Sequence, residues 1–171
     1  MVPSIRMPMN IGKIHEKLKS LSWMVGEWKS ITAVVNYPTM KSPVNYNENL
    51  SFTSLGQPFL NYRSLTWNTE NGAPMHLESG FLRIDEDEVS VSFLIAQSFG
   101  VATVEEGTAK DNAIITNTSA IGHMKFVRQK VVRLQRYYKL NEGGQLEYTV
   151  LMETPRTPLT QHVAVLYEKC S

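Results

Sequence analysis

The chain has 171 residues, of which 42% are apolar and 19% charged, so it can form one domain with a substantial core. Lys and Arg together number 17 and Asp and Glu 16, so there is no basic excess of the kind that phosphate binding requires. Nucleic acid is therefore not an expected partner. A membrane is not expected either, because no run approaches the ~20 apolar residues of a membrane span.

Cysteine usage limits the chemistry further. Cys170 is the only cysteine, which excludes a disulfide within the chain and a thiolate-based zinc or iron–sulfur site. The N-terminal sequence lacks the unbroken apolar core of a secretory signal. We therefore expect a cytoplasmic protein.

One segment near the N-terminus has a helical pattern. Ile11, Ile14, Leu18 and Leu21 recur at intervals of three and four residues, with Asn10 as an N-cap. Gly26 ends any continuation of this helix. We expect residues 1–10 to form a loose N-terminal segment of a single domain that spans 1–171.

From residue 26 onward the apolar pattern has a period of two, and turn residues separate the apolar runs. This pattern predicts ten strands, near 26–35, 44–55, 59–68, 75–84, 88–97, 100–109, 112–119, 128–140, 144–153 and 162–169. Gly56-Gln57-Pro58 and Gly143-Gly144 are examples of the turns between them.

The predicted fold class is all-β. Ten strands joined by tight turns, without crossover helices, indicate an antiparallel up-and-down meander. Closing this sheet into a barrel removes both of its exposed edges and leaves room for a ligand inside. A two-sheet sandwich is the alternative architecture.

Several short motifs resemble those of one family, the nitrobindins. The motifs occur in the family's order from about Leu21 to the C-terminus: Gly26-Glu27-Trp28, Tyr37-Pro38-Thr39, Pro74-Met75-His76-Leu77-Glu78-Ser79-Gly80-Phe81, Ala96-Gln97-Ser98-Phe99-Gly100-Val101, Val104-Glu105-Glu106-Gly107 and Pro158-Leu159-Thr160-Gln161-His162-Val163. The resemblance implies a ten-stranded barrel like those of lipocalins and fatty-acid-binding proteins. It also implies a ferric haem b, binding of nitric oxide and isomerisation of peroxynitrite to nitrate.

One part of the family signature differs here. The pattern Gly-x-Trp-x-Gly-x-Gly has Ser30 and Thr32 at its second and third glycine positions. The loss of these glycines is expected to affect a bulge or a close backbone approach in the first strand.

The resemblance makes His162 the axial ligand of the haem iron and the catalytic residue. A neutral imidazole is a suitable donor for iron. By itself, a lone histidine that opens a strand is more often a packing residue. The ligand role therefore depends on the match of the Thr160-Gln161-His162 block.

Four further residues are implied at the haem. Met75 and His76 begin a strand near its open face, and regular strand geometry allows only one of them to point inward. Thr39 and Lys130 match positions beside the haem, where a hydroxyl or an ammonium can contact a propionate. Alternatively, His76 is a solvent-facing turn residue and Lys130 an ordinary solvated lysine at a strand edge.

The remaining candidates are interpreted as packing residues. Met24, Met40, Met124 and Met152 suit the core or the barrel rim, and we expect Trp23, Trp28 and Trp67 to plug and line the barrel. The other histidines have no family counterpart at the pocket: His15 lies on the predicted helix and His123 in the loop before the eighth strand.

Two other functions remain open from the sequence. A carrier of fatty acids or similar apolar ligands would use an Arg-x-Tyr pair, and Arg136-Tyr137-Tyr138 contains one, although in the eighth strand rather than the last. A sensor of nitric oxide would use the same haem without turnover. The expected partners are haem and small nitrogen oxides, with the chain a monomer or a homodimer.

Overall fold

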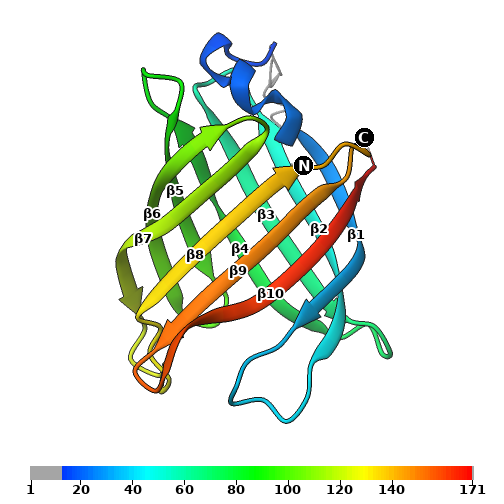
Figure 1. Cartoon of the computed structure of the whole chain (residues 1–171), viewed down its shortest axis with the longest axis vertical. Helices are drawn as coiled ribbons and strands as arrows, with labels where there is room; N and C mark the ends of the chain where they lie inside the picture. Colours follow the sequence, from blue (N-terminus) through cyan, green and yellow to red (C-terminus); the bar gives the residue numbers. More distant parts are fainter. Residues whose placement is uncertain (1–12, 171) are drawn as a thin grey trace, which may run out of the picture.

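The computed structural model describes residues 13–170. They form ten antiparallel strands and one short 3₁₀ helix (Figure 1). The elements are η1 (Glu16–Met24), β1 (Gly26–Val35), β2 (Val44–Ser54), β3 (Phe59–Asn68), β4 (Pro74–Ile84), β5 (Ser90–Gln97), β6 (Val101–Lys110), β7 (Ala113–His123), β8 (Arg133–Leu140), β9 (Leu146–Thr154) and β10 (Thr157–Lys169).

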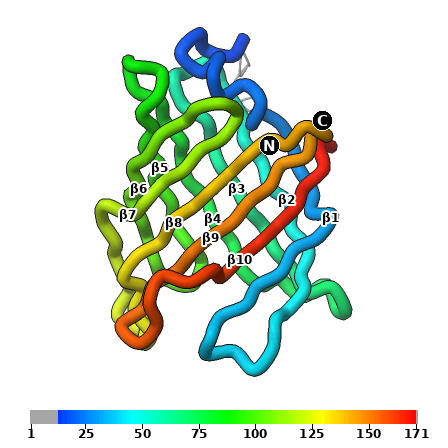
Figure 2. The backbone as a smooth tube through the Cα atoms, in the orientation of Figure 1, coloured from blue at the N-terminus to red at the C-terminus, as the bar shows by residue number. Residues whose placement is uncertain are grey.

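The sheet closes on itself. Each strand pairs with its neighbours in the chain, and β10 pairs with β1, for example through Val165 and Ala33. Figure 2 shows the last strand running beside the first. The prediction of an up-and-down barrel is therefore confirmed, and the two-sheet sandwich is wrong, because closure gives every strand a neighbour on both sides.

The helix differs from the prediction in type and extent. Leu18, Leu21 and Met24 are fully buried, and their spacing of three residues matches the three residues per turn of a 3₁₀ helix. His15 caps it by accepting a hydrogen bond from the backbone N–H of Lys17. The predicted cap at Asn10 lies outside the described residues, as does the segment 1–10.

Three strand boundaries differ from the prediction by four or five residues. β8 begins at Arg133 rather than at 128, so residues 124–132 form a loop, and β7 continues to His123. β10 begins at Thr157, which places His162 within the strand rather than at its start. Among residues 13–170, no helix is long and apolar enough to cross a membrane.

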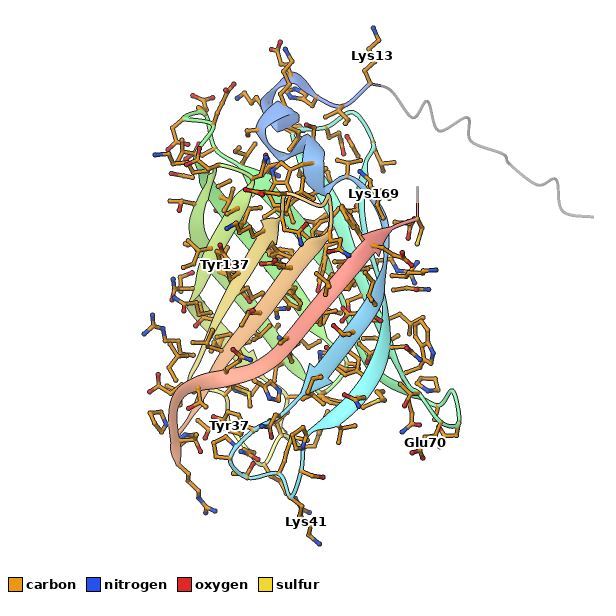
Figure 3. All side chains as sticks on the ribbon, turned by 45° about the vertical axis from the view of Figure 1, so that its right-hand side comes forward. Lys13, Tyr37, Lys41, Glu70, Tyr137 and Lys169 are labelled. Atoms are coloured by element: carbon orange, nitrogen blue, oxygen red, sulfur yellow. The ribbon has the colours of Figure 1, made fainter. Side chains whose placement is uncertain are left out.

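The barrel interior has layers along its axis. Beneath η1, which covers one end in Figure 1, the interior is filled by an apolar core that includes Phe52, Leu82 and Phe93. A buried polar layer, formed by Glu78, Glu105 and Arg136, follows in the middle. Beyond it a cavity extends to the opposite end. The side chains of Tyr37 and Lys41 lie at that end in Figure 3. The cavity is therefore bounded by the polar layer at one end and by loops at the other.

Trp28 belongs to the core rather than to the cavity. It is buried, and its indole Nε1–H donates to the carbonyl of Met24 at 2.8 Å, which joins β1 to the end of η1. The cavity is lined by none of the three tryptophans. The expectation that the tryptophans plug and line the barrel is therefore confirmed for Trp28, and Trp23 packs against the same core.

Candidate functional site

The cavity has a volume of about 460 Å³. Its walls are mainly apolar and include Val35, Met40, Val131, Met152 and Val163. The sequence-predicted residues Thr39, Met75, His76 and His162 all line it. An apolar cavity with a few convergent polar groups is the usual form of a site for a small molecule or cofactor.

His162 enters this cavity because β10 carries a bulge. The register with β9 shifts between Gln161 and Val163, which leaves His162 as the extra residue. His162 and its neighbour Val163 can therefore both line the cavity, although adjacent residues of a regular strand point to opposite faces.

The surroundings of His162 fix its ring and its tautomer. Its Nδ1 lies 3.1 Å from the carbonyl oxygen of Asn36, and its ring meets that of Tyr37 edge-on at 5.3 Å. A carbonyl can only accept, so Nδ1 carries the proton and Nε2 retains its lone pair. Burial lowers the pKa of His162 below its usual value, although the hydrogen bond to Asn36 opposes this effect. The imidazole is thus neutral at pH 7.

Met75 and His76 also both line the cavity, so the expectation that only one of them points inward is wrong. The register between β3 and β4 shifts opposite Thr66, where β4 carries an extra residue. The Thr66 hydroxyl accepts from the N–H of His76 at 2.8 Å and donates to its carbonyl at 2.9 Å. This side chain replaces the missing ladder bonds and stabilises the bulge.

Lys130 is exposed in the loop between β7 and β8 and is not among the residues that line the cavity. Its neighbours Gln129 and Val131 line the cavity instead. Thr39 is exposed in the loop between β1 and β2, at the open end. Contacts of Thr39 and Lys130 with a ligand would thus be made at the rim.

Ser30 and Thr32 replace family glycines in β1 without removing the local irregularity. The register with β10 shifts between these two residues, so a bulge is present. The Ser30 hydroxyl accepts from the backbone N–H of Glu48 at 2.9 Å, which links the bulge to β2. A side chain here therefore supplies a hydrogen bond that glycine could not make.

Sequence reasoning missed the polar layer at the inner end of the cavity. Arg136 is 2% exposed and is held by Glu78 and Glu105, which are 9% and 0% exposed. Its guanidinium also contacts the Tyr148 hydroxyl. The signal was present in the sequence, because Glu78 shares a strand face with Leu82 and Ile84, and Arg136 shares one with Leu134 and Tyr138.

Glu48 is a second buried carboxyl group that lines the cavity. The Ser64 hydroxyl donates to it at 2.6 Å. Burial raises the pKa of Glu48 from 4.5 to about 7, although this hydrogen bond opposes the change. Glu48 is therefore largely protonated below neutral pH.

Glu48 is expected to make the protein less stable as the pH rises. Its pKa is higher in the folded state, so the folded state retains the proton between pH 4.5 and 7 whereas the unfolded chain loses it. The free energy of unfolding should fall by roughly 1.4 kcal/mol per pH unit in this window because of this group. Urea unfolding of Glu48→Gln at pH 5 and pH 8 checks this. The variant should gain stability relative to the wild type at pH 8. An equal difference at both values would contradict the expectation.

Comparisons with known proteins agree with this architecture. The family model described as "THAP4-like, heme-binding beta-barrel domain" matches residues 17–169. The crystal structure of Rv2717c from M. tuberculosis superposes with a TM-score of 0.83 at 28% identity, covering 93% of this chain and all of that one.

Relatives with similar sequences come from animals, plants and bacteria. Peroxynitrite isomerase THAP4 of Rattus norvegicus is 36% identical over 92% of this chain, which corresponds to 28% of the relative's own length. Peroxynitrite isomerase Rv2717c of Arabidopsis thaliana is 34% identical over 91% of this chain and 90% of that protein. The chain thus spans about a quarter of the mammalian relative and nearly all of the plant one. It belongs to the family of THAP4-like, heme-binding β-barrel domains, the nitrobindin family that its motifs indicate.

Proposed function

We propose that the chain binds haem b in the barrel cavity through Nε2 of His162 and isomerises peroxynitrite to nitrate there. Nitric oxide would bind at the same place. The main observation behind this proposal is the His162 imidazole. It is neutral, it lies at the wall of an apolar cavity, and its Nδ1–H is taken up by the Asn36 carbonyl, so that only Nε2 is available as a donor.

The donor set fits a haem better than a bare metal ion. Within residues 13–170, no group of three or more His, Cys, Asp or Glu side chains is placed to hold a metal. A porphyrin supplies four nitrogen ligands itself and needs one axial ligand from the protein. A backbone carbonyl on the second ring nitrogen is the usual outer partner of a ligating histidine. His162 has both features.

A ferric haem supplies Lewis-acid and one-electron chemistry at an O–O bond, and the chain supplies the surroundings. His162 would anchor the cofactor, and apolar side chains such as Val35 and Val163 would exclude water from it. Peroxynitrite and nitrate contain the same atoms and carry the same charge. The net reaction therefore requires neither an added proton nor an added electron from the protein.

The proposal is tested by measuring how fast peroxynitrite decays and which product it forms. Stopped-flow absorption should show faster decay with the haem-loaded chain than with the apoprotein, and the product should be nitrate with less nitrite. Equal decay rates would argue against isomerisation. They would leave a sensor of nitric oxide as the function of the same haem.

The carrier function is disfavoured by the ion pairs that Arg136 already makes. In carriers such an arginine binds the carboxylate of a fatty acid, but here Glu78 and Glu105 already neutralise it. A third carboxylate at this position would be repelled by both.

Lys130 is expected to contribute little. Because it is exposed at the rim, Lys130→Ala should weaken haem affinity severalfold at most, as expected for a solvated ion pair worth ~0.2–1 kcal/mol. Titration with ferric haem measures the affinity, and Lys13→Ala, at the opposite end of the barrel, is the matched control. A spectral change as large as that from the loss of His162 would show that Lys130 does more than contact a propionate.

A cytoplasmic location and the absence of nucleic acid and membrane partners stay predictions from the sequence. The same holds for the oligomeric state, monomer or homodimer.

A further inference from the structure

A chain of buried ionic contacts crosses the barrel interior at the inner end of the cavity. Arg136 on β8 donates from Nε to Oε1 of Glu105 on β6, at 2.9 Å. It also donates from Nη1 to Oε2 of Glu78 on β4, at 3.0 Å, and from Nη2 to Oε1 of Glu78, at 3.1 Å. The two-point contact with Glu78 fixes the plane of that carboxylate.

Both ends of this contact chain are anchored. Glu105 accepts from the hydroxyls of Thr103 and Thr116, at 3.0 and 2.8 Å, and none of these three residues lines the cavity. Glu78 accepts at Oε2 from the Tyr62 hydroxyl, at 2.7 Å. Oε1 of Glu78 is therefore presented toward the cavity from a rigid support.

His76 lies within hydrogen-bonding distance of this oxygen. Its Nε2 lies 3.1 Å from Oε1 of Glu78, and its ring packs against Phe99 with centroids 4.8 Å apart. Thr66 holds its backbone on both sides. Burial by itself raises the pKa of Glu78, but Arg136 and His76 lower it below its usual value, so Glu78 is an anion. A carboxylate can only accept, so Nε2 of His76 carries a proton.

The proton on Nε2 of His76 affects which histidine can bind a metal in the cavity. His76 and His162 line the same space, and a second imidazole with a free Nε2 would be a competing ligand for a metal in it. A nitrogen that carries a proton has no lone pair to donate.

We propose that Glu78 is a positioning residue that keeps Nε2 of His76 protonated and withheld from the iron, so that only His162 ligates it. The inference rests on the proposed haem function. Arg136 and Glu105 act through Glu78, because they keep it ionised and fixed in the interior.

The first test needs no haem. Long-range proton–nitrogen NMR of the apoprotein reports which ring nitrogen of each histidine carries the proton. We expect His76 to be the Nε2–H tautomer in the wild type. In Glu78→Leu it should become a mixture, with Glu78→Gln restoring part of the Nε2–H form through its amide oxygen. A wild-type His76 protonated at Nδ1 alone would overturn the proposal, even if no variant folds.

The second test uses the haem-loaded protein. Glu78→Leu should convert much of the ferric haem from high spin to a low-spin, two-histidine spectrum, and the double variant Glu78→Leu/His76→Phe should return it to high spin. Glu106→Leu removes an exposed carboxylate from β6 and should match the wild type. An unchanged spectrum in Glu78→Leu, or a low-spin spectrum that persists in the double variant, would refute the positioning role. If the wild type binds no haem, the proposed function fails. The NMR test still decides separately whether Glu78 keeps Nε2 of His76 protonated.

Discussion

Replacing His162 with alanine is expected to abolish axial ligation and to weaken haem binding by more than 100-fold. The reason is that His162 offers the one cavity imidazole whose Nε2 has a free lone pair, since His76 is hydrogen-bonded to Glu78. Even outer partners of metal ligands are worth ~10–100-fold in affinity, so loss of the ligand itself should cost more. Absorption titration of each protein with ferric haem measures the effect.

The barrel should survive this substitution. His162 is half-buried, and the contacts of its ring are the edge of Tyr37 and the Asn36 carbonyl. His15→Ala is the matched control, because it removes a histidine at the other end of the barrel and should leave haem binding unchanged. The assignment is wrong if His162→Ala retains a histidine-ligated spectrum, or if His76→Ala loses ligation while His162→Ala does not.

Arg136→Met is expected to lower the free energy of unfolding by roughly 3–5 kcal/mol, because it leaves two buried carboxylates without their cation. The side chain of methionine fills similar space, so the loss of charge rather than of volume should dominate. Urea unfolding of the apoprotein at pH 7 gives the free energy directly.

Arg133→Met is the matched control on the same strand. Arg133 is exposed and donates to Asn117 at 2.7 Å, so its loss should change stability by about 0.5 kcal/mol or less. Equal effects of the two substitutions would show that the buried ion pairs contribute no more than a surface hydrogen bond. Recovery of stability in Arg136→Met at low pH would support the stated cause, since protonation removes the unpaired charges.

Much of the fold could be predicted because strand patterns are local. The predicted ranges 26–35 and 59–68 coincide with β1 and β3, because turn residues follow both of these apolar runs. The predicted range 128–140 begins before β8 because Val131 and Val132 belong to the preceding loop, where Val131 lines the cavity and Val132 is exposed. Apolar residues in a loop do not mark a strand.

The site was harder to predict because its geometry depends on one bulge in β10 and another in β4. The alternation of a strand gives one inward face, and it assigns His162 to the face opposite Val163. The register shifts in β10 and β4 bring both members of each adjacent pair into the cavity. Such shifts depend on pairing with a partner strand and on contacts such as those of Thr66, which no local pattern records.

The buried ion pairs were missed for a different reason. A glutamate in a strand is usually solvated, so the burial of Glu78 and Glu105 was not predicted from the sequence. Only their partner, 58 residues away for Glu78 and 31 for Glu105, makes their burial possible. This pairing across strands is a property of the closed barrel and not of any one segment.

The central claim is that the cavity holds a haem through His162, and a titration of the purified apoprotein with ferric haem tests it most directly. We expect a sharp Soret band that saturates at one haem per chain, together with an iron–histidine stretch in the resonance Raman spectrum of the ferrous form. A broad band that does not saturate, together with one-to-one binding of a fatty acid that haem fails to displace, would contradict the claim and favour a carrier.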